Sequence, residues 1–371
     1  MSTKPLVDAL ALGIIPANVS KFYKKSCLAQ ISVVDPSTFQ VNLEAASICS
    51  EIQLKGAISD GVFEGPTTRF VDNVLLKQLL STIDTATVSF EFVDNGVVIH
   101  AGKSKFTLSQ LVETDEIELI RPDSTMLSSN SVSIDKSGWN FIKANQMYAI
   151  SLAFIHPVYT YVWVGQSGDV LVCDYDNGLF THSVKSNLNQ TCLLKDTIIN
   201  LLTSVPDGST FYQHDNHYLV HVKTDGYEML SQFSPKYETD ADTGDYHSDM
   251  IMMMLEHSNA DAIRVNVAAL NRVLNQAELL ASSSEDTIMF KVDNNQVTLR
   301  DSNVNCTIST EGTAPESYEV LFKTTLLKSV INHYQSEDLV SICPIVQDDH
   351  TVGIIVWNKD VETAVAGTDN A

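Results

Sequence analysis

The sequence has no long apolar run, no paired cysteine motif and no excess of basic residues. No apolar stretch reaches the ~18 residues that a membrane-spanning helix needs, so no such helix is predicted. The six cysteines stand singly, without a C-x-x-C pair. This spacing favours a reducing cytoplasm over a secreted disulfide framework, and it predicts no zinc site. We therefore expect a cytoplasmic protein without a bound metal.

Motifs of catalysis are also missing. The chain has no phosphate-binding loop, no G-x-S-x-G elbow, no H-E-x-x-H helix and no convincing Cys–His pair. We therefore predict a protein that is not an enzyme, with no catalytic residues and no cofactor. An enzyme with an unrecognised site is the lesser alternative.

Acidic residues outnumber basic residues by two to one. The 371 residues include 46 Asp and Glu against 23 Lys and Arg, which gives a net charge of −23. This balance taken alone argues against nucleic acid, because a polyphosphate needs a positive surface. It favours the alternative of a tandem-domain structural protein, or one whose acidic surface mimics DNA.

One helical phrase occurs three times along the chain. It reads VLLKQLL at residues 74–80, TIINLL at 197–202 and TLLKSVI at 325–331. Leu76, Ile199 and Leu327 hold the same place in the phrase, which spaces the copies by 123 and 128 residues. A period of this length indicates tandem domains, since solenoid repeats are several-fold shorter.

Alternating strands surround each copy of the phrase. Residues 88–92 alternate in polarity, a turn follows at residues 94–96, and a second alternating run begins at Val97. Each unit reads helix, strands, helix, strands, which predicts the α+β class, with two helices packed on antiparallel sheets. The predicted domains are 1–124, 125–245 and 246–360, followed by a disordered tail at 361–371.

Basic residues concentrate in the predicted helices. Six windows, at 4–25, 68–83, 135–148, 192–204, 266–281 and 321–334, hold about half of the 23 basic residues but only five of the 46 acids. Lysine and glutamate favour helices about equally, so helix propensity does not explain the missing acids. If the helices line a channel inside a wall of sheets, duplex DNA fits that lining through its phosphates alone. The predicted channel-lining residues are Lys21, Lys24, Lys25, Lys77, Lys136, Lys143, Lys195, Arg272, Lys323 and Lys328.

Helical periodicity predicts a polar stripe on two of the midpoint helices. Spacing of four residues places it at Asn73, Lys77 and Ser81 in the first, with Val74 and Leu75 on the apolar side. In the third midpoint helix, the same spacing predicts a stripe at Thr324, Lys328 and Asn332.

Two short motifs resemble a known family. Residues 102–108, GKSKFTL, resemble the G-[KR]-S-[KR]-F-x-L stretch that ends the first domain of the bacterial-type DNA sliding clamp, the beta subunit of the replicative polymerase. Residues 232–237, QFSPKY, are similar to the F-P-x-Y element that closes its second domain. Domain order and length agree along essentially the whole chain. The resemblance extends to the cellular and the phage-encoded forms of the clamp.

The resemblance implies a DNA clamp fold and a function that follows from topology. Six similar domains form the family's closed ring, so two copies of this chain would join head to tail around double-stranded DNA and act as a polymerase processivity factor. The implied partners are the replicative DNA polymerase and the clamp loader, whose short peptides bind a hydrophobic pocket between the second and third domains. By position, that pocket draws on Leu179, Pro235, Tyr237, Leu326, Ile354 and Val356.

Two segments depart from the family pattern near this pocket. Residues 174–179 read DYDNGL where family members commonly carry T-D-G-H-R-L, so the His-Arg pair is missing. Residues 354–358 read IIVWN where the family often ends in M-P-M-R-L, and a polar tail follows.

Two clusters of possible metal ligands have simpler interpretations. His214, His217 and His221 straddle a predicted turn, which favours an exposed hairpin over an opportunistic zinc site. The acidic run at 238–249 lacks the residue order of a calcium loop, and we interpret it as an inter-domain connector.

Overall fold

The computed structural model describes two compact units. The described residues are 1–14, 28–45, 48–56, 65–112, 117–134, 136–145, 162–164, 169–174, 179–184, 192–194, 196–214, 217–233, 262–280, 287–312, 314, 316–334, 337–347, 350–359 and 361–367. One unit combines Met1–Asn140 with Lys195–Glu238, and the other combines Phe141–Leu194 with Thr239–Ala371.

The first unit alternates helices with groups of strands. Its elements are α1 (Thr3–Ile14), β1 (Leu28–Asp35), β2 (Thr38–Ala45), β3 (Ile48–Lys55), β4 (Thr67–Asp72), α2 (Asn73–Ser81), β5 (Ser89–Val93), β6 (Gly96–Ala101), β7 (Ser104–Ser109), the 3-10 helix η3 (Ser124–Ser128), β8 (Asn130–Ser133), α4 (Asp196–Ser204), β13 (Thr210–His214), β14 (His217–Lys223) and β15 (Tyr227–Phe233). Helix α3 (Lys136–Asn145) crosses the sequence boundary between the units.

The second unit also alternates helices with groups of strands. It contains β9 (Val162–Val164), β10 (Asp169–Asp174), β11 (Leu179–Val184), β12 (Cys192–Leu194), β16 (Ile263–Asn266), α6 (Val267–Leu280), β17 (Thr287–Asp293), β18 (Gln296–Arg300), β19 (Asn305–Ser309), β20 (Tyr318–Lys323), α7 (Thr324–His333), β21 (Leu339–Gln347), β22 (His350–Trp357) and β23 (Val361–Ala366). The predicted α+β class is therefore confirmed.

Each unit is built on one eight-stranded antiparallel sheet. In the first unit the strand order is β4-β1-β2-β3-β15-β14-β13-β8, and in the second it is β12-β9-β10-β11-β23-β22-β21-β16. The middle of each sheet joins strands that are far apart in sequence: Ser50 pairs with Ser231, and Leu179 pairs with Val365. A smaller sheet accompanies each one, β5-β6-β7 in the first unit and β19-β18-β17-β20 in the second.

The repeated helical phrase forms the same element each time. Leu76 of α2, Ile199 of α4 and Leu327 of α7 are all buried, as expected if each copy packs its helix on a sheet in the same way. Asp72 is the N-cap residue of α2: its carboxylate accepts a 2.7 Å hydrogen bond from the Leu75 amide. Such an N-cap contributes about 1 kcal/mol to helix stability. Gly96 then makes the predicted hairpin turn with φ 148°, where a side chain would collide with the Leu108 carbonyl.

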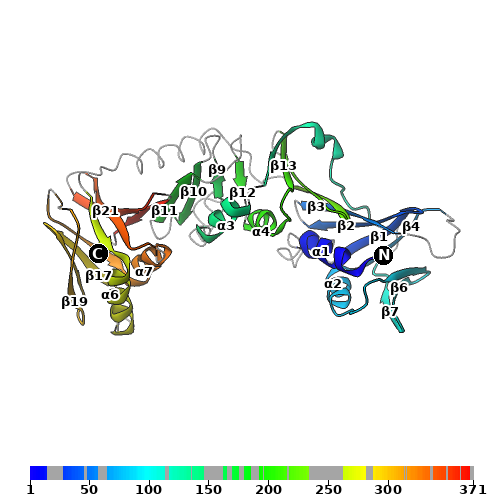
Figure 1. The fold of residues 1–371 in the computed structure, drawn as a ribbon, viewed down its shortest axis with the longest axis horizontal. Helices are drawn as coiled ribbons and strands as arrows, with labels where there is room; N and C mark the ends of the chain where they lie inside the picture. Colours follow the sequence, from blue (N-terminus) through cyan, green and yellow to red (C-terminus); the bar gives the residue numbers. More distant parts are fainter. Residues whose placement is uncertain are drawn as a thin grey trace. The chain divides into compact units, whose positions relative to one another are not determined.

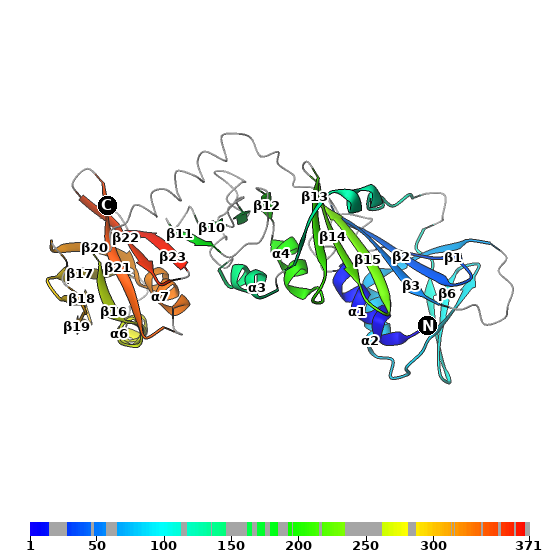
Figure 2. The same cartoon turned by 45° about the horizontal axis from the view of Figure 1, so that its top comes forward.

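The helices of the first unit pack on one face of its large sheet. Helix α1 lies beside α2 and against the joined strands β3 and β15 (Figures 1 and 2). Its Gly13 faces Leu43 and Ile52, so those side chains mark the helix-covered face. In the second unit α6 and α7 pack side by side (Figure 1).

The opposite face of the first unit's sheet carries the segment that follows β7. The Ile120 amide donates to the Glu44 carboxylate at 2.8 Å, and Leu119 packs with Leu28 and Phe70. Buried amides on this face satisfy one another, as where Gln40 Nε2 donates to Asn42 Oδ1 at 2.9 Å. Gln40, Asn42 and Glu44 on this face are therefore buried although they are polar.

The predicted boundaries need two corrections. The helical windows at 68–83, 192–204 and 321–334 begin too early, because β4, β12 and β20 lead into the helices with at most one intervening residue. The predicted tail is wrong for residues 361–366. They form β23, which pairs with both β11 and β22 and buries Thr363, Ala364 and Val365. The strand Ile354–Val356 is consequently not the last of the chain.

The three-domain division stays a prediction. The two compact units do not follow its boundaries, since β3 and β15 would belong to different predicted domains but share one sheet. The same holds for β11 and β23.

Candidate nucleic-acid interface

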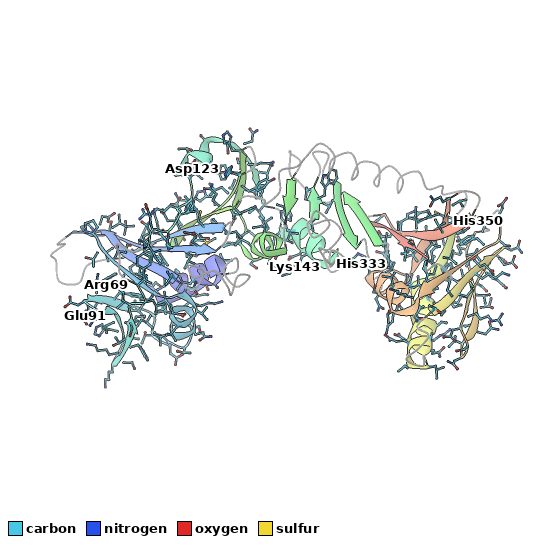
Figure 3. All side chains as sticks on the ribbon, turned by 180° about the vertical axis from the view of Figure 1, so that it is seen from behind. Arg69, Glu91, Asp123, Lys143, His333 and His350 are labelled. Carbon is cyan, nitrogen blue, oxygen red and sulfur yellow. The ribbon has the colours of Figure 1, made fainter. Side chains whose placement is uncertain are left out.

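Six of the ten predicted channel-lining residues lie in the described part of the chain. Lys143 on α3, Arg272 on α6 and Lys323 at the start of α7 are exposed, and Lys77, Lys136 and Lys328 are half-buried. Figure 3 labels Lys143. The other four, Lys21, Lys24, Lys25 and Lys195, lie outside the described residues. Whether these side chains line one channel stays a prediction.

The predicted polar stripes are shifted from the observed faces. On α2, Asn73 is 1% exposed, whereas Val74 and Leu75 are 41% and 51% exposed. On α7, Thr324 is likewise buried. Asn73 and Thr324 directly follow the strands β4 and β20. The first position of each helix therefore lies against the sheet. Lys77 and Lys328 are both the fifth residue of their helix, directly after a buried leucine.

Helix α6 carries an open groove that is lined by both apolar and polar side chains. A volume of about 520 Å³ is lined by Val267, Ala268, Asn271, Arg272, Asn275, Gln276 and Leu279. These residues carry one positive charge and no negative charge. Amide and guanidinium donors on one helix face suit a phosphate oxygen, because each donates a hydrogen bond to an anion.

An ion pair joins α6 to α7. The Lys328 ammonium donates to the Glu278 carboxylate in a short contact, and their side chains are 21% and 42% exposed. The end of α7 adds no further charge at neutral pH. Burial lowers the pKa of His333 from its usual value, so the imidazole is neutral. The sequence pattern did not reveal the Lys328–Glu278 pair, because its partners are fifty residues apart.

The residues of the predicted peptide pocket are partly brought together in the second unit. Leu179 and Ile354 both pair with Val365, from the two sides of β23. Leu326 on α7 is half-buried, but Ile354 and Val356 are fully buried and offer a peptide no exposed surface in this structure. Pro235 and Tyr237 lie outside the described residues. The pocket as a whole stays a prediction.

The three histidines lie on one hairpin. His214 pairs with His217 across the turn, and His221 Nε2 lies 2.8 Å from the Glu228 carboxylate. Within the described residues, no group of three or more His, Cys, Asp or Glu side chains is placed to hold a metal ion. The acidic run at 238–249 lies outside them. No helix in the described part of the chain is long and apolar enough to cross a membrane.

Comparison with solved structures identifies the fold. The chain matches the DNA polymerase sliding clamp of Bacillus subtilis with a TM-score of 0.76 at 12% identity, over 100% of this chain and 98% of that one. The DNA polymerase III beta subunit of Thermotoga maritima gives 0.73 at 11% identity, over 100% and 99%. The Helicobacter pylori beta clamp, solved with a bound DNA ligase peptide, gives 0.70 at 9% identity, over 100% and 99%.

At 9–12% sequence identity, these matches show similarity of fold. No protein-family model matches the sequence, and no curated protein is similar to it. The chain therefore has the DNA sliding-clamp fold over its whole length, which confirms the predicted fold.

Proposed function

We propose that this protein is a DNA sliding clamp, a processivity factor that encircles duplex DNA and tethers the replicative polymerase. The observation that carries the proposal is the full-length match to the clamp fold. The distribution of charge supports it, because basic residues lie on helices of a strongly acidic chain. We expect the protein to work in the cytoplasm, with no chemistry of its own.

Weak, sequence-independent contacts suit such a function. Each lysine or arginine that neutralises a phosphate releases a counterion, and the resulting affinity is the same for every base sequence. A clamp must move along DNA, so strong contacts would oppose its function. The encircling topology provides the retention that the contacts do not.

We propose that the ring closes in the way that the large sheets form, by pairing of the last strands of two meanders. Strands β3, β15, β11 and β23 each end a three-stranded meander, and they join in pairs at the middle of the large sheets. The meanders β5-β6-β7 and β17-β18-β19 end in β7 and β19, which have a free edge among the described strands. We propose that β7 of one copy pairs with β19 of a second copy, giving a head-to-tail homodimer.

Burial limits the register of this contact to pairings that keep the apolar side chains on one face, and we propose one of these. Leu108 is buried and Phe106 half-buried on β7, while Ile308 is buried and Cys306 half-buried on β19. Placing Leu108 opposite Cys306 and Phe106 opposite Ile308 keeps all four on one face. The exposed pair Thr107 and Thr307 then lies face to face on the other side.

The double variant Thr107→Cys/Thr307→Cys is expected to form a covalent dimer under mild oxidation. Residues directly opposite in an antiparallel pair have Cα atoms about 4.5–5.5 Å apart, within the range that a disulfide spans. Non-reducing electrophoresis would show the dimer. The single variant Thr107→Cys is the matched control, because native Cys306 faces the opposite side of the sheet. Equal cross-linking of the single and double variants would contradict the proposed register.

The peptide pocket is proposed for the second unit, around Leu179 and Leu326. The Helicobacter pylori clamp was solved with a DNA ligase peptide, and by analogy we propose that this chain binds peptides of its polymerase and clamp loader. The loss of the His-Arg pair from residues 174–179 leads us to expect a different peptide preference.

Changing Leu179 and Leu326 together to serine is expected to weaken binding of the polymerase's terminal peptide by about tenfold or more, because one or two apolar anchors supply most of such an affinity. Calorimetric titration of the peptide measures this effect. The control Val34→Ser removes an apolar side chain, 41% exposed, from β1. Unchanged peptide affinity in the double variant would move the pocket elsewhere.

A further inference from the structure

The lysines of α2 and α7 occupy the same place in two repeats but have different surroundings. Both are the fifth residue of the helix, after a buried leucine. Lys328 is bound by Glu278 of the neighbouring helix α6. Lys77 forms no ion pair with the described residues, although α1 packs against α2 as α6 packs against α7. The second unit therefore has a feature at this place that the first lacks in its described part.

Glu278 is the only acidic residue of α6 and α7. The two helices otherwise carry Arg272 and Lys328 as full charges, since His333 is neutral. Because the Lys328 side chain is only 21% exposed, solvent and salt screen its attraction to Glu278 less than they would at an open surface. A phosphate approaching Lys328 must therefore displace the carboxylate or share the ammonium with it, and the carboxylate repels the phosphate.

We propose that Glu278 is an internal competitor of DNA phosphate for Lys328. This proposal rests on the proposed clamp function and specifies how one of its contacts is regulated. The carboxylate keeps the lysine in place when no phosphate is near, and it weakens the phosphate contact when one is. Each chain of the ring therefore binds DNA phosphate more weakly at Lys328 than an unpaired lysine would. Weaker binding favours sliding along the DNA.

The test is a comparison of Glu278→Gln with the parent in binding to a duplex DNA over a salt series. Glutamine preserves size but removes the charge. The variant is expected to bind several-fold more tightly at low salt, with a plot of log affinity against log salt steeper by up to about 0.9 per released counterion. Fluorescence anisotropy of a labelled duplex measures both quantities. On circular DNA, the loaded variant is expected to diffuse more slowly than the parent.

A double variant separates this mechanism from a general effect of charge. In a Lys328→Gln background, Glu278→Gln is expected to give a clearly smaller gain than in the parent, because it removes only the repulsion by the carboxylate and no lysine remains to be released. The matched control is Glu228→Gln, which removes a carboxylate paired with Lys223 at 3.4 Å on the strands of the first unit. That variant is expected to bind DNA like the parent.

Each contrary result has a distinct meaning. Parental affinity and salt slope in Glu278→Gln would overturn the competition, as would an equal gain in the Lys328→Gln background. If Lys328→Gln binds like the parent, Lys328 is not a phosphate contact and the inference also fails. If the parent is not retained on circular DNA, the clamp function itself fails, and that result is independent of Glu278.

Discussion

Two copies of this chain, loaded onto nicked circular DNA, are expected to stay bound through gel filtration and to be lost once a single cut linearises the DNA. The reason is topological: a closed ring cannot leave a circle, but it slides off an open end within the time of the experiment. The phosphate contacts alone are too weak at physiological salt to hold it. The measured quantity is the fraction of protein that elutes with the DNA before and after cutting.

Blocking both ends of the linear DNA with a bulky bound protein provides the control. Retention is then expected to return to the level of the circle, because sliding is obstructed while the contacts are unchanged. Equal retention on circular and open linear DNA would show ordinary binding and contradict an encircling ring. No retention on any DNA would favour the alternative of an acidic structural or DNA-mimicking protein.

The sequence predicted the repeat and the fold class well, because these depend on local periodicity. Leu76, Ile199 and Leu327 share a position in the phrase and are all buried. A helix presents one side to its sheet whatever lies further along the chain, so a repeated pattern gives a repeated packing.

Pairings between distant strands could not be predicted from the sequence. Alternation identifies a strand and its faces, but it does not say which strand lies beside it. Residues 361–366 illustrate the limit: the short segment VETAVA has no strong strand pattern, and its order comes from β11 and β22 on either side. Sequence reasoning therefore interpreted a central strand of the second sheet as a tail.

Alternation also misleads where both faces of a sheet are covered. Gln40, Asn42 and Glu44 read as solvent-facing residues of β2, but all three are buried. The segment after β7 reaches Glu44, whose carboxylate accepts a hydrogen bond from the Ile120 amide, while Gln40 donates a hydrogen bond to Asn42 within the sheet. These contacts come from other strands and from a distant segment, so no local pattern encodes them. For the same reason the pairing of Glu278 with Lys328 required the packing of α6 on α7.

Reversing the charge of Lys77, Lys143 and Arg272 together to glutamate is expected to weaken the phosphate contacts enough to abolish loading onto DNA and processive synthesis. A dimer loses six positive charges and gains six negative ones on its helices. Proteins with 6–10 phosphate contacts lose roughly 10³–10⁵ in affinity when salt alone weakens those contacts, so a comparable loss is expected here. Lys143 and Arg272 are exposed and Lys77 is half-buried on a helix surface, so the fold should survive.

A second triple variant tests whether position, rather than net charge, is responsible. Lys55, Lys291 and Lys359 are exposed on β3, on β17 and in the turn before β23, and their change to glutamate alters the charge equally. This sheet variant is expected to retain most of the parental processivity, because long-range repulsion between exposed charges is screened beyond about 8–10 Å at physiological salt. Circular dichroism and solution mass establish that both variants fold and dimerise. If the two triple variants lose processivity equally, the helices do not line the DNA channel. If neither loses it at any salt concentration, phosphate contacts are unnecessary, and encirclement alone would account for the tethering.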